Sequence, residues 1–146
     1  AKNCEGKVPT CGALTDEDQA ILKACSTALD EARNAIDQNL VHKAVQAVWD
    51  VVADANKYFA NAEPWALKKT DPERMATVLY TTAEVIRRLS ILAQPIVPES
   101  AAKLLDTLAV DETARLFAHL DDAHKLQPGA ELPAPSPVFK RIERDA

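Results

Sequence analysis

The chain has 146 residues, only three of them glycine, and carries a formal net charge of −5. This length is typical of one domain with a core of its own, since about 150 residues bury roughly 68–70% of their unfolded surface. The glycines lie near the ends, at Gly6, Gly12 and Gly129. The glycine-rich loops that hold nucleotide phosphates are therefore missing, and so are the tight hairpins of a sheet protein. We predict an all-α protein without nucleotide chemistry of its own.

The acidic charge argues against a general binder of DNA or of membrane surfaces, which should be basic. Contact with nucleic acid would have to come from a small local patch. The odd number of cysteines, Cys4, Cys11 and Cys25, and the lack of a secretory leader predict reduced thiols and a cytoplasmic location. No apolar run approaches the roughly 20 residues of a membrane span. The chain opens on Ala1 rather than on methionine, and we expect it to be a piece of a longer protein.

The first half of the chain is predicted to form two long helices after a connector over residues 1–14. Thr15 and Asp18 are spaced like a capping box. Apolar residues then recur every three or four positions, which predicts a helix of about 22 residues, roughly 33 Å long. A second stripe of the same kind runs from about Leu40 to Asn61. It is wide enough to be buried by more than one neighbour.

The third helix has the clearest start in the sequence. Asp71 can cap it with Pro72 at the first helical position, or Thr70 and Glu73 can form a capping box. Its apolar stripe continues towards Pro95, which should end or kink the helix because proline has no amide hydrogen to donate.

Two shorter helices and a tail complete the prediction. Pro98 opens one short helix, and an amphipathic segment from Asp111 to about Leu120 supplies the other. Residues 126–146 hold four of the nine prolines and are predicted to be an extended tail. The expected architecture is an all-α bundle of three long and two short helices, with its helical domain over residues 15–125.

Catalytic and metal sites find little support in the sequence. Cys4 and Cys11 are not accompanied by a second pair of cysteines that could complete a four-ligand metal site. His119 and His124 are five residues apart, which would place them on different faces of a helix. Cys25 falls on the apolar stripe of the first helix and is interpreted as a small core residue. We predict neither a catalytic residue nor a metal site in this chain.

A tryptophan beside two lysines stands out at the junction after the second helix. Trp65 follows Glu63 and Pro64, and Lys68 and Lys69 come one turn later. An aromatic face beside cationic groups can stack on an unpaired base and meet its phosphate. The alternative is that Trp65 fills the gap between two helix ends. Residue types alone favour this second interpretation, because tryptophan is highly buried on average.

The junction belongs to a series of runs whose order and spacing extend over essentially the whole chain. The runs are residues 14–18, 48–58, 64–69, 92–98 and 137–143. Together they resemble the C-terminal helical domain of bacterial-type methionyl-tRNA synthetases.

This resemblance implies an anticodon-binding bundle of a class I synthetase, with methionine tRNA as its partner. In the family, the tryptophan of the Pro-Trp junction stacks on the first base of the CAU anticodon, a role that maps onto Trp65. The resemblance therefore favours base stacking by Trp65 over the interpretation that Trp65 fills the gap between two helix ends. The family's other base-reading residues, an asparagine and an arginine, would lie on a helix that precedes Ala1. The resemblance also implies a parent enzyme that activates methionine with ATP and magnesium and esterifies it to tRNA, its catalytic motifs lying outside these residues.

Several polar residues around the junction are weaker candidates for contacts with the tRNA backbone. They are Asn56, Lys68, Lys69 and Arg74. Arg87 and Arg88 lie in the middle of the third helix, and we expect at least one of them to face solvent. The tail over residues 126–146 is expected to dock on the catalytic domain of the same enzyme.

Two other functions stay open at this point. The chain could be a helical protein-interaction module without an RNA role, docking a partner through its apolar faces. It could also be the anticodon bundle of another class I synthetase. Binding of methionine tRNA that is lost when the anticodon is changed would distinguish anticodon recognition from a protein-interaction module. The identity of the bound tRNA would show whether the chain belongs to another class I synthetase.

Overall fold

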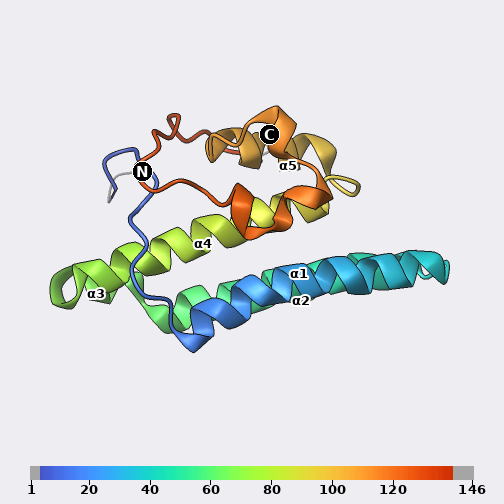
Figure 1. Cartoon of the computed structure of the whole chain (residues 1–146), viewed down its shortest axis with the longest axis horizontal. Coiled ribbons are helices and arrows are strands. Elements are labelled where there is room, and N and C mark those ends of the chain that lie inside the picture. Colours follow the sequence, from blue (N-terminus) through green and yellow to red (C-terminus); the bar gives the residue numbers. More distant parts are fainter. Residues whose placement is uncertain (1–3, 140–146) are drawn as a thin grey trace, which may run out of the picture.

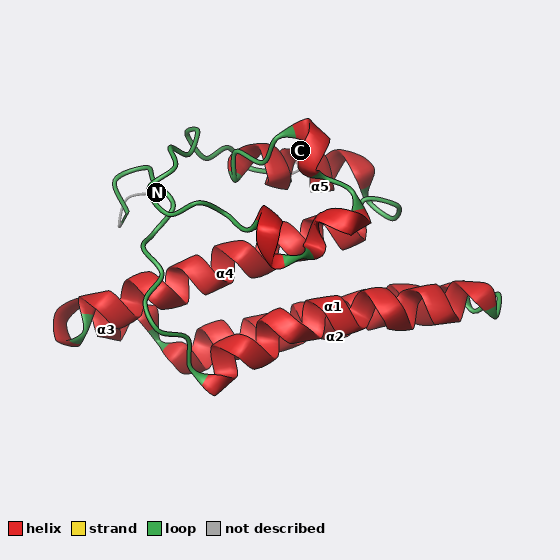
Figure 2. Cartoon of the chain, viewed as in Figure 1, coloured by secondary structure: helices red, strands yellow, loops and turns green. Residues whose placement is uncertain are grey.

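The computed structural model describes residues 4–139 and, over that range, contains helices and turns but no β-strand (Figure 1, Figure 2). Three long helices are α1 (Asp16–Asp37), α2 (Val41–Ala62) and α4 (Pro72–Ala93). Two short ones are α3 (Pro64–Thr70) and α5 (Pro98–Thr107). The turns η1 (Glu112–Ala114), η2 (Phe117–Leu120) and η3 (Asp122–His124) follow. The prediction of an all-α bundle is confirmed.

The starts of the long helices follow from their caps. At α1, Thr15 accepts a hydrogen bond from the backbone N–H of Asp18, and the Asp18 carboxylate accepts one from the backbone N–H of Thr15, 2.9 Å away. At α4, the Asp71 side chain accepts from the backbone N–H of Arg74 at 2.9 Å, with Pro72 in the first turn. Of the two predicted starts for this helix, the structure uses Asp71 and Pro72.

The long helices are arranged around α4. Helices α1 and α2 form a hairpin that packs against α4, while α5 also packs on α4 and α3 packs on its first turns (Figure 1). The core lies between these elements and includes Cys25, Val48, Val78, Ile91 and Leu105, each at most 2% exposed. The burial of Cys25 confirms its interpretation as a core residue. Helix α3 lies at one end of the molecule, and the α1–α2 turn lies at the other (Figure 1).

One local prediction is wrong, and one short helix is missing from the prediction. The segment from Asp111 to Leu120 forms 3-10 turns rather than a short α-helix, and the second short helix is instead α3. Asp111 and Asp121 each cap a new turn with their side chains, which competes with continuing a regular helix. Helix α3 escaped detection because seven residues are too few to show a helical period.

The segments before α1 and after η3 lie beside each other. The backbone of Val8 exchanges hydrogen bonds with Gly129 and Ala130, at 2.9 and 2.8 Å. Val8 is buried, and so is Leu126, whose carbonyl oxygen accepts a hydrogen bond from the Tyr80 hydroxyl at 2.9 Å. These stretches of the predicted connector and tail thus pack on the helices of this chain. Residues 140–146 of the predicted tail lie outside the described residues.

Candidate nucleic-acid interface

The short helix α3 is amphipathic and displays the predicted stacking residue. Pro64 is buried and Leu67 packs against the core. Trp65, Lys68 and Lys69 are exposed, and their spacing of three and four residues sets them on one face of the helix. The two lysines lie in the last turn, where cations interact favourably with the helix dipole. Helix α3 therefore presents an indole and two ammonium groups side by side.

The indole of Trp65 is 61% exposed, so it does not fill a gap between helix ends. Its ring contacts Phe59 near the end of α2, with ring centroids 6.1 Å apart and planes inclined at 64°. An edge contact of this kind orients an aromatic ring while leaving much of its surface free. Trp65 is thus held by Phe59, while the exposed part of its indole is accessible to a further aromatic ring, such as a nucleic-acid base.

The turn from α2 into α3 is made at a single residue. Glu63 has φ 42° and ψ 54°, the left-handed conformation, and is at once the last cap of α2 and the first cap of α3. A residue other than glycine is disfavoured there by roughly 1–2 kcal/mol. Pro64 cannot continue the preceding helix, so α2 ends at Ala62 and α3 begins at Pro64.

A buried carboxylate joins the elements on either side of α3. Asp18 is fully buried and accepts hydrogen bonds from the Tyr58 hydroxyl at 2.5 Å and from Nη1 and Nη2 of Arg74 at 2.5 and 2.9 Å. Burial by itself would raise the pKa of Asp18, but the hydrogen bonds from Arg74, Tyr58 and Thr15 lower it to about 2. Burial and the bond to Asp18 together raise the pKa of the Tyr58 hydroxyl. We call Asp18, Tyr58 and Arg74 the Asp18 cluster.

The structure separates the weaker candidates into different environments. Lys68 and Lys69 share the face of Trp65, as described above. Asn56 is exposed on α2, one turn before Phe59, the residue that contacts Trp65. The guanidinium of Arg74 points into the Asp18 cluster, and its side chain is 22% exposed.

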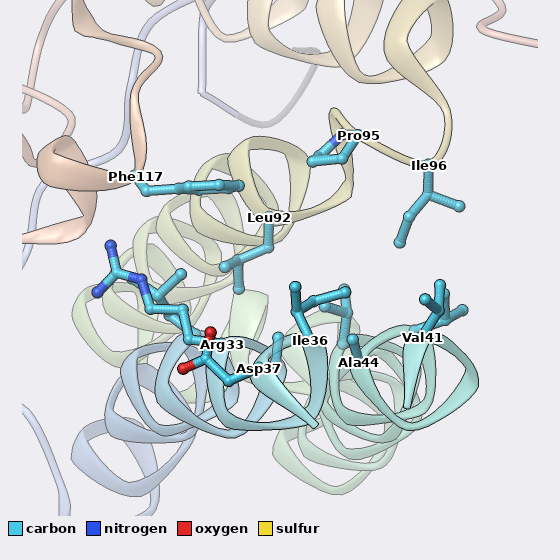
Figure 3. Close-up of a pocket in the computed structure, with 13 residues that line it drawn as sticks. Arg33, Ile36, Asp37, Val41, Ala44, Leu92, Pro95, Ile96 and Phe117 are labelled. Atoms are coloured by element: carbon cyan, nitrogen blue, oxygen red, sulfur yellow. The ribbon is translucent and has the colours of Figure 1, made fainter. Parts of the chain in front are cut away.

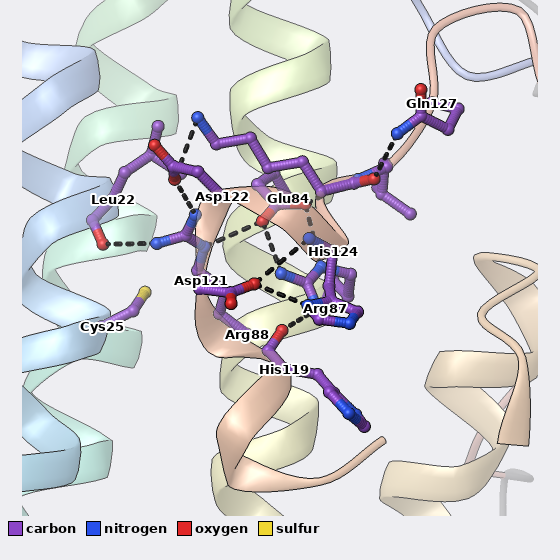
Figure 4. A network of polar contacts seen from close by, with 12 residues as sticks. Leu22, Cys25, Glu84, Arg87, Arg88, His119, Asp121, Asp122, His124 and Gln127 are labelled. Carbon is purple, nitrogen blue, oxygen red and sulfur yellow. Dashed lines mark hydrogen bonds and ion pairs between the residues drawn. The ribbon is translucent and has the colours of Figure 1, made fainter. Parts of the chain in front are cut away.

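A second buried network lies on α4, where the expectation of a solvent-facing arginine is wrong. Arg87 and Arg88 are 1% and 4% exposed, and both lie in a network of polar contacts around Glu84 (Figure 4). Both donate to Glu84, which is itself fully buried; the distances are 2.8 Å from Nη2 of Arg87 and 2.8 Å from Nε of Arg88. Arg87 also donates to the carbonyl oxygen of His119, and Arg88 to Asp122. The network attaches the η2–η3 region to α4.

Sequence reasoning missed the central members of both networks, although a signal for each is present. Asp18 stands three and four residues before the buried Ile21 and Leu22, so it shares the inner face of α1. Glu84 similarly stands four residues before Arg88 and seven before the buried Ile91 on α4. A charged residue in register with an apolar stripe is the pattern that could have revealed them.

The far end of the molecule carries an apolar groove of about 360 Å³ between the α1–α2 turn and the end of α4 (Figure 3). Ile36 and Val41 line one side and are 51% and 60% exposed. Leu92, Ile96 and Phe117 line the other. Exposed apolar surface of this kind typically marks a place where another surface packs.

Residues 4–139 hold neither a cluster of metal-ligating side chains nor a membrane-spanning helix. Within that range no group of three or more histidine, cysteine or acidic residues is placed to hold a metal ion. The rings of His119 and His124 contact each other, with centroids 4.3 Å apart, because these residues lie on successive 3-10 turns and not on opposite faces of a helix. Among the same residues, no helix is both long and apolar enough to span a membrane.

The all-helical bundle with an exposed Pro-Trp helix at one end is the architecture of an anticodon-binding domain. Residues 8–146 match the family model described as the anticodon binding domain of methionyl tRNA ligase. The chain belongs to this family, and not to the anticodon bundles of other class I synthetases.

Individual relatives agree with this assignment. The methionine–tRNA ligase of Rhizobium meliloti is 56% identical over 140 residues, which are 96% of this chain and 27% of that protein. That of Mycobacterium bovis is 41% identical, covering 98% of this chain and 28% of that protein. The chain thus spans little more than a quarter of the length of these relatives.

Solved structures show the same fold. The apo crystal structure of Mycobacterium tuberculosis methionyl-tRNA synthetase matches with a TM-score of 0.90 at 39% identity, covering 99% of this chain and 29% of that one. The structure of that enzyme bound by methionyl-adenylate matches with a TM-score of 0.89 at 40% identity, covering 95% of this chain and 28% of that one.

Proposed function

We propose that this chain is the tRNA anticodon-binding portion of a methionine–tRNA ligase and that Trp65 stacks on the first base of the CAU anticodon. The observation that carries the proposal is the exposed indole on α3, with Lys68 and Lys69 on the same face of the helix. Stacking on an aromatic side chain contributes about 1–3 kcal/mol per base, and lysines supply phosphate contacts. The local patch reconciles RNA binding with a net charge of −5, a charge that does not suit general binding of DNA.

The other candidates take different parts in this proposal. Asn56 lies close enough to the Phe59–Trp65 contact, one helical turn away, to reach the same RNA loop. Arg74 acts indirectly, because its guanidinium is bonded to Asp18. Trp65, Lys68, Lys69 and Asn56 therefore form the contact surface, and Arg74 supports it.

The parent ligase would activate methionine with ATP and magnesium and transfer it to methionine tRNA in the cytoplasm, where translation takes place. Its catalytic residues would lie in the part of the ligase that this chain does not contain, since the chain matches little more than a quarter of its relatives. Within the ligase, this chain contributes recognition of the tRNA and no step of the chemistry.

The apolar groove supports a second contact, with the remainder of the same ligase. The relatives have nearly three quarters of their length outside the matched region, and Ile36 and Val41 offer an open apolar surface at the end opposite α3. We assign this groove to packing against that remainder. The tail over residues 126–146 would dock on the catalytic domain of the same ligase.

Replacing Trp65 by Ala in the full-length ligase tests the anticodon role. We expect kcat/KM for charging methionine tRNA to fall by about 1–3 kcal/mol, or roughly 5- to 150-fold. Methionine-dependent exchange of pyrophosphate into ATP, which needs no tRNA, should stay unchanged. Trp49→Ala is the matched control, since Trp49 is also exposed, at 43%, but lies on α2 away from α3.

Two outcomes would overturn the stacking role. One is an equal fall in charging and in pyrophosphate exchange, which would make Trp65 a structural residue. The other is unchanged charging. The remaining alternative is a protein-interaction module without an RNA role. It is tested by comparing the binding of the wild-type chain to methionine tRNA with its binding to the same tRNA carrying an altered anticodon, because such a module would not distinguish the two tRNAs.

A further inference from the structure

Helix α3 is short and has few constraints of its own. It has seven residues, packs chiefly on α4 and buries only Pro64. It is joined to α2 by the single left-handed residue Glu63, and Asp71 both ends it and begins α4. The direction in which it points is therefore set largely by the positions of the two helices that flank it.

Those two helices are tied together by one carboxylate. Tyr58 lies in the last turns of α2, five residues before Glu63, and Arg74 lies in the first turn of α4, three residues after Asp71. Both donate to Asp18 of α1, Tyr58 at 2.5 Å and the two terminal nitrogens of Arg74 at 2.5 and 2.9 Å. Hydrogen bonds to a charged group are about twice as strong as those between neutral groups.

The Asp18 cluster also borders the surface of α3 directly. Arg74 and Leu67 of α3 line a common hollow with the first residues of α1. Phe59, which follows Tyr58, makes the edge contact with the Trp65 ring. A movement of the end of α2 relative to α4 would consequently move both the support of α3 and the ring that orients the indole.

We propose that Asp18, Tyr58 and Arg74 are positioning residues for anticodon recognition. By fixing the end of α2 against the start of α4, they set the orientation in which α3 presents Trp65. The inference rests on the proposed anticodon role for its functional consequence, but its structural part, the control of Trp65 by the cluster, stands apart from that role.

Fluorescence of the chain tests the structural part without RNA. Trp49→Phe leaves Trp65 as the one tryptophan of the two in the sequence. In that background, Tyr58→Phe keeps the ring and removes its hydroxyl from Asp18. We expect a shifted Trp65 emission, lower anisotropy and altered acrylamide quenching. Tyr80→Phe is the matched control, because Tyr80 is a buried phenol that donates to Leu126, outside the cluster.

Unchanged Trp65 fluorescence in Tyr58→Phe, or an equal change in Tyr80→Phe, would overturn the positioning role. If Tyr58→Phe fails to fold, Arg74→Lys replaces it as a milder variant. Lysine keeps the charge but cannot donate two parallel hydrogen bonds to one carboxylate. Either variant should give the same fluorescence change if the cluster positions α3.

Charging by the full-length ligase tests the functional part. We expect Tyr58→Phe to raise the KM for methionine tRNA on the order of 3- to 10-fold, with pyrophosphate exchange and the methionine KM unchanged. Combined with Trp65→Ala, Tyr58→Phe should add almost nothing, since it acts through the indole that is already missing. Full additivity of the two effects would overturn the inference.

Failure of this inference and failure of the proposed function give different results. If Trp65→Ala leaves charging unchanged, anticodon stacking is wrong, while the fluorescence change still shows that the cluster positions Trp65. If Trp65→Ala impairs charging but Tyr58→Phe affects neither fluorescence nor the tRNA KM, the stacking role stands and the positioning role is refuted.

Discussion

Replacing Glu84 by Gln should destabilise the chain severely, although the two side chains have nearly the same size. In the structure Glu84 is fully buried and accepts four hydrogen bonds. Three come from Arg87 and Arg88, at 2.8–3.0 Å, and the fourth from the backbone N–H of Leu126, at 3.1 Å. Glutamine would remove the negative charge. Its amide NH2 group would then face N–H groups that can only donate hydrogen bonds.

The size of the loss follows from the charges that would remain. Two buried guanidinium groups would face a neutral amide, and Asp122, whose side chain is 77% exposed, would be the one carboxylate still bonded to Arg88. Breaking a buried ion pair by removing one partner costs about 3–5 kcal/mol. For a chain of this length each kcal/mol lowers the Tm by about 3 °C, so we expect a fall of roughly 10–15 °C.

Denaturation of the chain in urea, followed by circular dichroism, measures this loss. Asp54→Asn serves as the control, because it removes one partner of an exposed ion pair, Asp54 and Lys57, and should change the free energy of unfolding by less than about 1 kcal/mol. Trypsin should also cut faster after Lys125 in Glu84→Gln, since loss of the carboxylate weakens the contact that holds the backbone N–H of Leu126. A loss below about 1 kcal/mol would refute the reasoning, because water would then be solvating the arginines.

Two further predictions concern Asp18 and the apolar groove. The pKa of Asp18 is lowered from 3.8 to about 2, so the carboxylate contributes about 2 kcal/mol of stability that is complete above about pH 4 and is lost as the pH falls towards 2. Asp18→Asn should abolish this part of the acid dependence in urea titrations between pH 5 and 2; the same dependence in both proteins would contradict the assignment. The isolated chain should bind the apolar dye anilinonaphthalene sulfonate in the groove, and Ile36→Ser should weaken this binding severalfold while Trp49→Ser should not. Equal effects of the two substitutions would show that the dye binds elsewhere.

The helices and their starts could be predicted because their signals are local. Thr15 with Asp18, and Asp71 with Pro72, carry their capping chemistry within four residues, and the structure uses both. The all-α class followed from the placement of three glycines and from apolar spacing. The segment after Ala109 defeated this reasoning, because side-chain caps and the hydrogen bonds of Arg115 to the Val110 carbonyl, at 3.1 and 2.5 Å, replace a regular helix.

The candidate site was predicted in part. The neighbourhood of Trp65, Lys68 and Lys69 follows from helical spacing alone, once α3 is known to be a helix. Whether the indole is buried or exposed could not be read from its neighbours, since that depends on how far α4 covers α3. Arg74 looked like a surface cation, but a partner 56 residues away in the sequence accepts its hydrogen bonds.

What the amino-acid sequence determined by itself was the helical class, the positions of the long helices and, through resemblance, the anticodon-binding family. Each of these depends on residues that are close together in the chain or on motifs in a fixed order. The packing of the helices decided which partners the buried charges meet. Asp18 with Arg74 and Glu84 with Arg88 meet inside the bundle, because carboxylates and guanidinium groups in the core require partners, and one of these pairs bridges separate helices.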